Sequence, residues 1–167
     1  MFRISAYIAA VAVLVSCGFQ PIYKKGEKPG VQIAMASIGI ETIKDRQGQQ
    51  LRNLLLDRIN PGGAPQSPNY TLTLRLSAGK QLLALRKSKL STRANLNFVA
   101  IFELKGKKQY LGKNYSGTST ITVSYNILGS HFATLASEKN ARSRAVKELS
   151  LDISNRIAAY LRSQQES

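Results

Sequence analysis

The sequence has 167 residues, with 24 Lys and Arg against 9 Asp and Glu, and its formal net charge is +15. This length fits one domain, and a hydrophobic share of 43% excludes a wholly disordered chain. A single Cys excludes disulfide scaffolds and Cys-based zinc sites. What remains is a compact basic domain, and we expect its partner to be rich in phosphate or carboxylate: nucleic acid, an anionic membrane surface or an acidic glycolipid.

The amino terminus has the pattern of an export signal. A short basic region, Met1 to Arg3, precedes the apolar run Ile4–Val15, which is shorter than the roughly 20 residues needed to cross a bilayer. The junction Leu14-Val15-Ser16-Cys17 resembles a bacterial lipobox, in which the Cys thiol is acylated and the peptide is cut before that Cys. The alternative is an uncleaved, buried Cys in a short amphipathic helix. We expect a cleaved lipoprotein signal peptide over residues 1–16 and a covalent lipid on Cys17.

The residue after this Cys is Gly18. Lipoproteins that are retained in the inner membrane resemble one another in having Asp at that position. We therefore expect an outer-membrane protein, lipid-anchored on the periplasmic side. Cleavage removes one basic residue, Arg3, and leaves 23 basic against 9 acidic residues, a net charge of +14 over 151 residues. Because a periplasmic protein does not meet the chromosome, nucleic acid is not expected as a partner. Residues 17–30 contain Pro and Lys and predict an extended tether, followed by a single domain over residues 31–167.

The first predicted elements follow this tether. The mixed apolar pattern of Val31–Ile40 predicts a strand. Apolar residues at spacings of three and four predict a helix over Asp45–Asn60, with Asp45 as a possible cap and Pro61 as the stop. The period then changes to two in Tyr70–Ser77, which predicts a half-buried strand.

A meander of strands is predicted next. Arg93–Leu104 alternates in the same way, which makes it an antiparallel neighbour of the preceding strand. Between the two, Lys80–Leu90 extends the ribbon to a tip near Arg86–Lys89, and a second tip falls at Lys105–Lys108. A fourth strand is predicted over Gln109–Tyr125.

The chain closes with a predicted helix over Thr134–Gln164, whose apolar residues line one stripe. The order of strand, helix, three strands and helix predicts an α+β fold. We expect a two-layer sandwich in which two helices pack on one face of a four-stranded mixed sheet.

Short catalytic patterns in the sequence are better explained by chance. Ser77-Ala78-Gly79-Lys80 matches a Ser-x-x-Lys pattern, and Ser124-Tyr125-Asn126 resembles a second box of penicillin-binding proteins. The sequence has no Lys-Thr-Gly box, and the first match lies on a strand rather than at the start of a helix. His131 has no companion ligand. We expect no enzyme, no catalytic residue, no metal, and no cofactor other than the lipid on Cys17.

The strongest functional signal is a run of positive charge. Residues 75–113 contain ten Lys or Arg and one acidic residue, Glu103. Such a surface suits phosphate groups through charge-assisted hydrogen bonds, although Lys on strand edges also prevents edge-to-edge aggregation. The candidate residues for binding the phosphate groups of an acidic glycolipid are Arg86, Lys87, Lys89, Arg93, Lys105, Lys107 and Lys108.

Four segments together carry a family resemblance: Cys17-Gly18-Phe19-Gln20-Pro21-Ile22-Tyr23, Tyr125–Leu128, Phe132–Ala136 and Ala141–Ala145. The chain resembles the LPS-assembly lipoprotein LptE family. The resemblance implies a non-enzymatic subunit that plugs the outer-membrane β-barrel LptD, assists its assembly, and binds lipopolysaccharide during insertion into the outer leaflet. The alternative is a lipoprotein that scaffolds another envelope machine, with its basic face on anionic lipid headgroups. An envelope hydrolase is a third class, for which we expect no activity.

Overall fold

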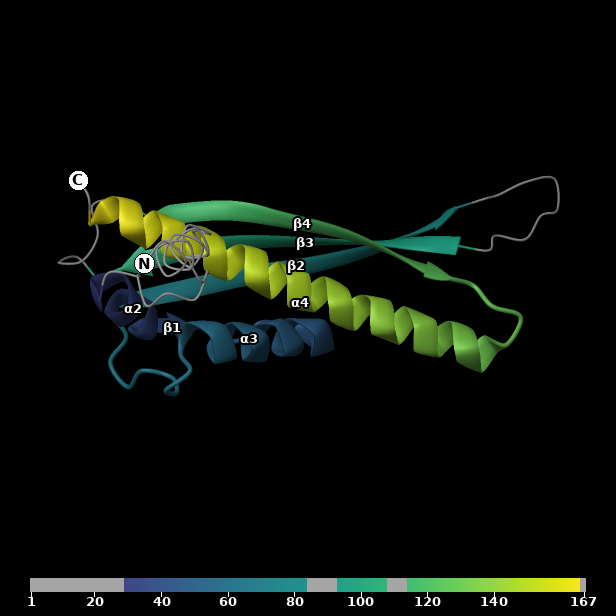
Figure 1. Ribbon diagram of the computed structural model, residues 1–167, viewed down its shortest axis with the longest axis horizontal. Coiled ribbons are helices and arrows are strands. Elements are labelled where there is room, and N and C mark those ends of the chain that lie inside the picture. Colours follow the sequence, from purple (N-terminus) through teal and green to yellow (C-terminus); the bar gives the residue numbers. More distant parts are fainter. Residues whose placement is uncertain (1–28, 84–92, 108–113, 166–167) are drawn as a thin grey trace, which may run out of the picture.

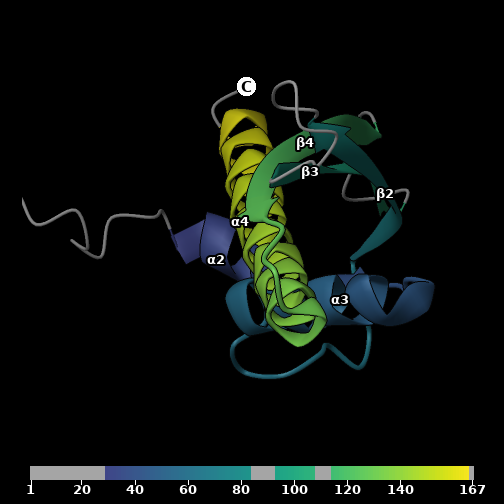
Figure 2. The ribbon, with the colours of Figure 1, turned by 90° about the vertical axis from the view of Figure 1, so that its right-hand side faces the viewer.

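The computed structural model describes residues 29–83, 93–107 and 114–165. These residues form the helices α2 (Pro29–Ala36), α3 (Asp45–Ile59) and α4 (His131–Gln164) and the strands β1 (Ile38–Ile40), β2 (Tyr70–Leu83), β3 (Arg93–Gly106) and β4 (Tyr115–Asn126). The helices α3 and α4 cover one face of an elongated sheet, and α2 packs against α4 (Figures 1 and 2). The predicted α+β fold is confirmed, with a third, short helix added.

The four strands lie in the order β1-β2-β3-β4. β1 is parallel to β2, whereas β2, β3 and β4 form the predicted antiparallel meander. Successive turns of a meander lie at opposite ends of the sheet. We call the end with Leu83, Arg93 and the start of α4 the distal end, and the end with Gly106, Tyr115 and α2 the proximal end (Figure 1).

The hydrophobic core lies between the sheet and the helices, where the alternating apolar residues of the strands face the apolar stripes of the helices. The strands contribute alternate residues, such as Leu72 on β2 and Phe102 on β3, and α3 contributes Leu51 and Leu55. The predicted stripe of α4 is buried in full: Ala145, Val146, Leu149, Ile153, Ile157 and Leu161. Full burial of a Leu or Ile side chain contributes about 1.5–3 kcal/mol to the stability of the fold. The packing of these α4 residues on the sheet therefore holds the two layers together.

The predicted strand over Val31–Ile40 is wrong in its first part. Residues Pro29–Ala36 are helical, and only Ile38–Ile40 form a strand. The helix places Val31, which is fully buried, on the same side as Ala34 and Met35, which also pack on the core. The tether expected over residues 17–30 lies outside the described residues, except that its last two residues begin α2.

Several boundaries also differ from the prediction. Asp45 does not cap α3, because it lies inside the first turn with φ at 68°, after the N-cap residue Lys44. α4 begins at His131, three residues earlier than predicted, because the Ser130 hydroxyl accepts a hydrogen bond from the backbone N–H of Ala133 at 3.4 Å. β2 continues six residues past Ser77 to Leu83, so the predicted extension of the ribbon is confirmed as far as the structure describes it.

Candidate functional site

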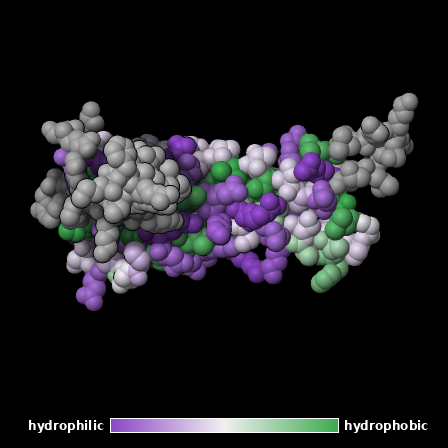
Figure 3. Space-filling view, in the orientation of Figure 1, coloured by the Kyte–Doolittle hydropathy of each residue, from purple (hydrophilic) through white to green (hydrophobic). Residues whose placement is uncertain are grey.

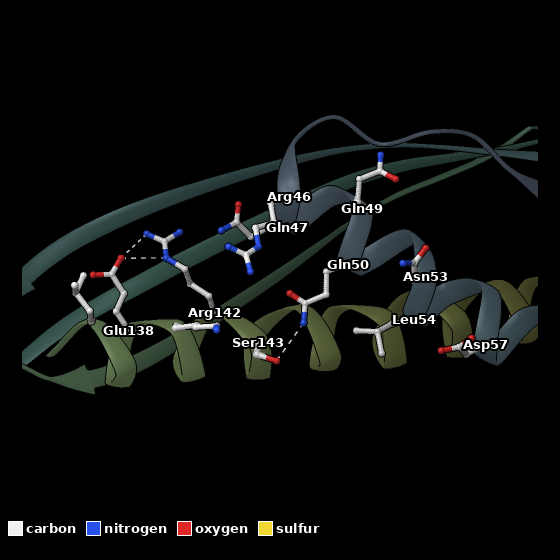
Figure 4. Close-up of a pocket in the computed structure, with 12 residues that line it drawn as sticks. Arg46, Gln47, Gln49, Gln50, Asn53, Leu54, Asp57, Glu138, Arg142 and Ser143 are labelled. Carbon is white, nitrogen blue, oxygen red and sulfur yellow. Dashed lines mark hydrogen bonds and ion pairs between the residues drawn. The ribbon is translucent and has the colours of Figure 1, made fainter. Parts of the chain in front are cut away.

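A cluster of charged and polar side chains joins the sheet to α4 near the distal end. The Glu138 carboxylate on α4 accepts a hydrogen bond from Lys80 Nζ of β2 at 2.8 Å and from the Tyr125 hydroxyl of β4 at 2.8 Å. Arg142, one turn further along α4, donates from Nη2 to the other oxygen of Glu138 at 2.6 Å (Figure 4). Lys80 Nζ also lies 5.4 Å from the centre of the Tyr125 ring, within cation–π range. We call these four residues the Glu138 cluster.

The cluster has strong electrostatic coupling. The hydrogen bond from Lys80 is the main cause that lowers the pKa of Glu138 to about 2, and the bonds from Arg142 and Tyr125 act in the same direction against partial burial. The same contact with Glu138 raises the pKa of Lys80. Glu138 therefore stays ionised, and this carboxylate neutralises part of the positive charge at the distal end.

A groove lies beside this cluster, between α3 and α4. Its volume is about 810 Å³, and its lining side chains are mainly charged or amide groups: Arg46, Gln50, Asn53, Glu138, Lys139 and Arg142 (Figure 4). Gln50 Nε2 donates to Ser143 Oγ at 3.1 Å and joins the two helices at the groove. Arg46 and Lys139 have no hydrogen-bond or ion-pair partner among the described residues. These donors suit a ligand that carries hydroxyl and anionic groups.

The structure separates the candidate basic residues into two groups. Arg93 begins β3 at the distal end, whereas Lys105 and Lys107 lie at the proximal end. Twelve residues separate Arg93 from Lys105 along one strand, which corresponds to about 40 Å at 3.3 Å per residue. Lys105 Nζ also forms an ion pair with Glu103 at 3.1 Å. The other candidates lie outside the described residues: Cys17, Arg86, Lys87, Lys89 and Lys108.

Sequence reasoning missed the Glu138 cluster as a unit. One signal was present, because Lys80 has the same strand parity as the buried residues Tyr70, Leu72 and Leu74. A Lys on the apolar face of a strand needs a partner on the layer that covers it, and that partner, Glu138, is 58 residues away in the sequence.

The geometry also bears on the catalytic patterns. Ser77 and Lys80 occupy opposite parities of β2, so the two side chains project from opposite faces of the sheet and cannot form a nucleophile and base pair. In the described ranges, no group of three or more His, Cys, Asp or Glu is placed to hold a metal ion. No described helix is both long and apolar enough to span a membrane.

Fold and site together define a class: an elongated, basic, two-layer α+β domain with basic residues at both ends of its sheet. Within this class, a family model described as LptE, Lipopolysaccharide-assembly, matches residues 31–161. The chain therefore belongs to the LptE family. This is a family of non-enzymatic outer-membrane lipoproteins with a role in lipopolysaccharide assembly. No curated protein sequence matches this chain closely enough to add to that assignment.

Solved structures show the same fold. A lipoprotein from Caulobacter crescentus is similar with a TM-score of 0.61 and 23% identity, and the match covers 81% of this chain and 97% of that chain. A minor lipoprotein from Acinetobacter baumannii has a TM-score of 0.56 and 20% identity, covering 74% and 90% of the two chains. The rare lipoprotein B from Shewanella oneidensis has a TM-score of 0.53 and 18% identity, covering 77% and 95%. At these identities the likeness supports the fold alone.

Proposed function

We propose that this protein is the lipoprotein subunit of a lipopolysaccharide translocon in the outer membrane. In this role it plugs an LptD-type β-barrel, assists its assembly, and binds lipopolysaccharide during insertion into the outer leaflet. The observation that carries the proposal is the family match over residues 31–161. Residues 1–16 then act as a cleaved signal peptide, and Cys17 carries the lipid that anchors the chain through residues 17–30.

The dimensions of the domain support a plug that crosses the whole membrane. β3 has 14 residues, about 46 Å in extended form, and α4 has 34 residues, about 51 Å as a helix. A bilayer with its headgroups is about 40–45 Å thick. Because α2 follows the tether and lies at the proximal end, a lipid on Cys17 sets that end at the periplasmic leaflet. The distal end then lies at the level of the outer leaflet, where lipopolysaccharide is inserted.

The outer face of the sheet suits the polar lumen of a barrel. On this face, β3 and β4 carry Ser, Thr and Asn side chains, and neighbouring strands pair them through hydrogen bonds. Thr122 Oγ1 donates to Asn97 Oδ1 at 3.0 Å, and Ser124 Oγ donates to Asn95 Oδ1 at 2.7 Å. Apart from Val99 and Ile101 on β3, the side chains named here are short and polar, which suits a barrel interior that is polar rather than apolar. We infer that the barrel wall covers this face.

The basic residues then act on lipopolysaccharide phosphates. Arg86, Lys87, Lys89 and Arg93 form the distal group by sequence, and Lys105, Lys107 and Lys108 form the proximal group. Each group offers charge-assisted hydrogen bonds to phosphates and competes with the divalent cations that bridge lipopolysaccharide molecules. The two groups correspond to the exit and entry ends of the translocon.

Affinity purification from outer membranes tests the plug. Recovery of a large β-barrel that stays bound through washing is expected, and depletion of the protein is expected to reduce surface lipopolysaccharide. Purification without a barrel would favour the alternative, a lipoprotein that scaffolds another envelope machine through its basic surface. Normal surface lipopolysaccharide after depletion would also contradict the proposal.

A further inference from the structure

The helix-facing side of β2 is covered at its proximal end and uncovered at its distal end. Tyr70, Leu72 and Leu74 are buried under the helices. Two residues of the same parity, Lys80 and Leu82, are exposed, and Leu82 is 60% exposed. The distal part of this face of β2 is therefore open to an occupant, whereas Ala94 and Tyr125 on the neighbouring strands stay buried.

The first turns of α4 add exposed apolar side chains at the same end. Phe132 is 82% exposed and Leu135 is 52% exposed, and a spacing of three residues puts them on one side of the helix. Leu128, 47% exposed, lies beside this turn because its backbone N–H donates to Thr134 Oγ1 at 2.9 Å.

Leu82 belongs to the same opening as these residues. The 2.8 Å contact between Lys80 and Glu138 fixes α4 over β2 at that point. Leu82 lies two residues further toward the distal end, and Leu135 lies one helical turn before Glu138, in the same direction. Leu82, Leu128, Phe132 and Leu135 thus form what we call the distal apolar cluster; among the described residues they are four of the seven exposed large hydrophobic side chains. Hydrophobic side chains are visible at this end in the space-filling view (Figure 3).

Cations border the cluster. Lys80 lies two residues before Leu82 on the same face of β2, and Lys139 lies one turn after Leu135 on α4. Lys80 keeps 43% of its side chain exposed despite its ion pair, and Lys139 is exposed. Apolar side chains bordered by Lys recognise an anionic amphiphile, because acyl chains pack on the apolar part while phosphates pair with the ammonium groups.

We propose that the distal apolar cluster seats acyl chains of lipopolysaccharide while Lys80 and Lys139 contact the phosphates of its lipid part. The inference rests on the proposed function, which places the distal end at the outer leaflet. It adds a site for the apolar half of the ligand that the basic residues alone do not provide. The charge that borders the cluster favours an anionic lipid over an apolar segment of a protein.

Binding of two related ligands to the full-length protein tests the apolar contact. We expect the double variant Phe132→Ser, Leu135→Gln to bind lipopolysaccharide about tenfold more weakly, because apolar area is lost from the contact. Binding of deacylated lipopolysaccharide is expected to stay unchanged, because that ligand has no acyl chains to seat. Leu151→Gln is the matched control: Leu151 is 46% exposed on the same helix, and its replacement is expected to change neither affinity.

The outcomes separate this inference from the proposed function. If the wild-type protein binds no lipopolysaccharide, both fail. If the wild type binds lipopolysaccharide and the double variant binds equally well, the inference alone is overturned. An equal loss of affinity for the deacylated ligand would also overturn it, because the substitutions would then act on something other than acyl chains. Circular dichroism spectra that match the wild type show that the variant is folded.

Crosslinking in cells identifies the occupant directly. A photoreactive amino acid at position 132 is expected to form an adduct with lipopolysaccharide, and the same group at position 151 is expected to form none. An adduct at position 132 with protein or with phospholipid, and not with lipopolysaccharide, would overturn the proposal.

Discussion

Lys80 of β2 and Glu138 of α4 form an ion pair with 2.8 Å between Nζ and Oε2, and this pair attaches the first part of α4 to the sheet. The first buried residue of α4 is Ala141, so the ten residues from His131 to Asn140 bury none of their side chains fully. Polar contacts of Glu138 and of Thr134 hold this part of the helix in place of apolar packing. Segments with few buried apolar contacts open at low free-energy cost. The stability of the start of α4 therefore depends strongly on the Glu138 carboxylate.

Glu138→Gln tests this dependence. The substitution keeps the size of the side chain and removes the charge that pairs with Lys80 and Arg142. We expect faster amide hydrogen exchange over residues 131–140 and a fall of about 1 kcal/mol in the free energy of unfolding, since the partners are partly exposed. Glu148→Gln is the matched control, because Glu148 is exposed on the same helix and has no hydrogen-bond or ion-pair partner among the described residues. Equal exchange rates in the two variants would contradict the prediction.

Acid is expected to destabilise the protein through the same carboxylate. The pKa of Glu138 in the folded state is about 2, against an ordinary value of 4.5, chiefly because Lys80 donates a hydrogen bond to it. A lowered pKa contributes stability that is present above the ordinary value and is lost as the pH falls toward the folded value. The melting temperature of the wild type should therefore decrease as the pH is lowered from about 5 to about 2. The melting temperature of Glu138→Gln should decrease less over the same range.

Asp152 contributes to acid sensitivity in the same direction. Burial acts to raise the pKa of this carboxyl, but hydrogen bonds from Ser119 at 2.6 Å and Arg156 at 2.9 Å outweigh burial and lower it. Glu138→Gln therefore reduces the dependence on pH without abolishing it. Identical pH profiles for the variant and the wild type would show that Glu138 is not the responsible group.

Local patterns predicted the parts of the fold in which one periodicity dominates. The alternation from Tyr70 and the stripe from Ala145 to Leu161 both proved to be core. The helix over Pro29–Ala36 was missed because Ile33, which is 70% exposed, interrupts the helical spacing of Val31, Ala34 and Met35, and the segment also packs against α4. A contact between such distant segments cannot be read from the local pattern.

The candidate site shows the same limit. The sequence showed where positive charge is concentrated, and meander topology alone implies that Arg93 and Lys105 lie at opposite ends of one strand. The pairing of Lys80 with Glu138 was not predictable from charge, because several acidic residues were available and only the crossing of α4 over β2 selects one.

Gly117 of β4 tests a close approach inside the core. A Cβ at this position would lie 2.6 Å from Cζ of Phe102, which is almost fully buried and packs edge-on against Tyr115 at 5.8 Å between ring centres. Gly117→Ala forces the ring or the strand to move, and we expect a loss of about 1–3 kcal/mol in the free energy of unfolding, measured by denaturant titration. Gly79→Ala is the control, because no atom lies within 4 Å of its added Cβ. If the denaturation midpoint of Gly117→Ala equals that of the wild type, the contact between Gly117 and Phe102 is not tight.

Cys17→Ala tests the anchor. We expect radiolabelled palmitate to enter the wild-type protein and not the variant, because the lipid is attached through the Cys17 thiol and Ala has no thiol. The variant should also leave the membrane fraction when no barrel partner retains it, since the lipid chains supply the membrane affinity. Incorporation of the palmitate label into the Cys17→Ala variant would show that another residue carries the lipid.

Charge reversal in matched triplets tests which end of the sheet binds phosphate. One variant replaces Arg86, Lys87 and Lys89 with Glu, and the other replaces Lys105, Lys107 and Lys108 with Glu. Both change the net charge by six units, so any general electrostatic effect is the same in the two proteins. Isothermal titration with lipopolysaccharide at two salt concentrations measures the affinity and its dependence on salt.

We expect charge reversal of Arg86, Lys87 and Lys89, the distal triplet, to weaken binding of lipopolysaccharide about tenfold or more, because charge-assisted contacts with phosphate are lost there. The salt dependence of the affinity should decrease for the same reason. The proximal triplet should have a smaller effect, since Lys105 is already paired with Glu103. A larger loss from the proximal triplet would place the main site at the periplasmic end of the domain, about 40 Å from the distal apolar cluster by the length of β3. Acyl chains at the distal end and phosphates at the proximal end could not then belong to one lipid molecule, so this result would also count against the site inferred for the acyl chains.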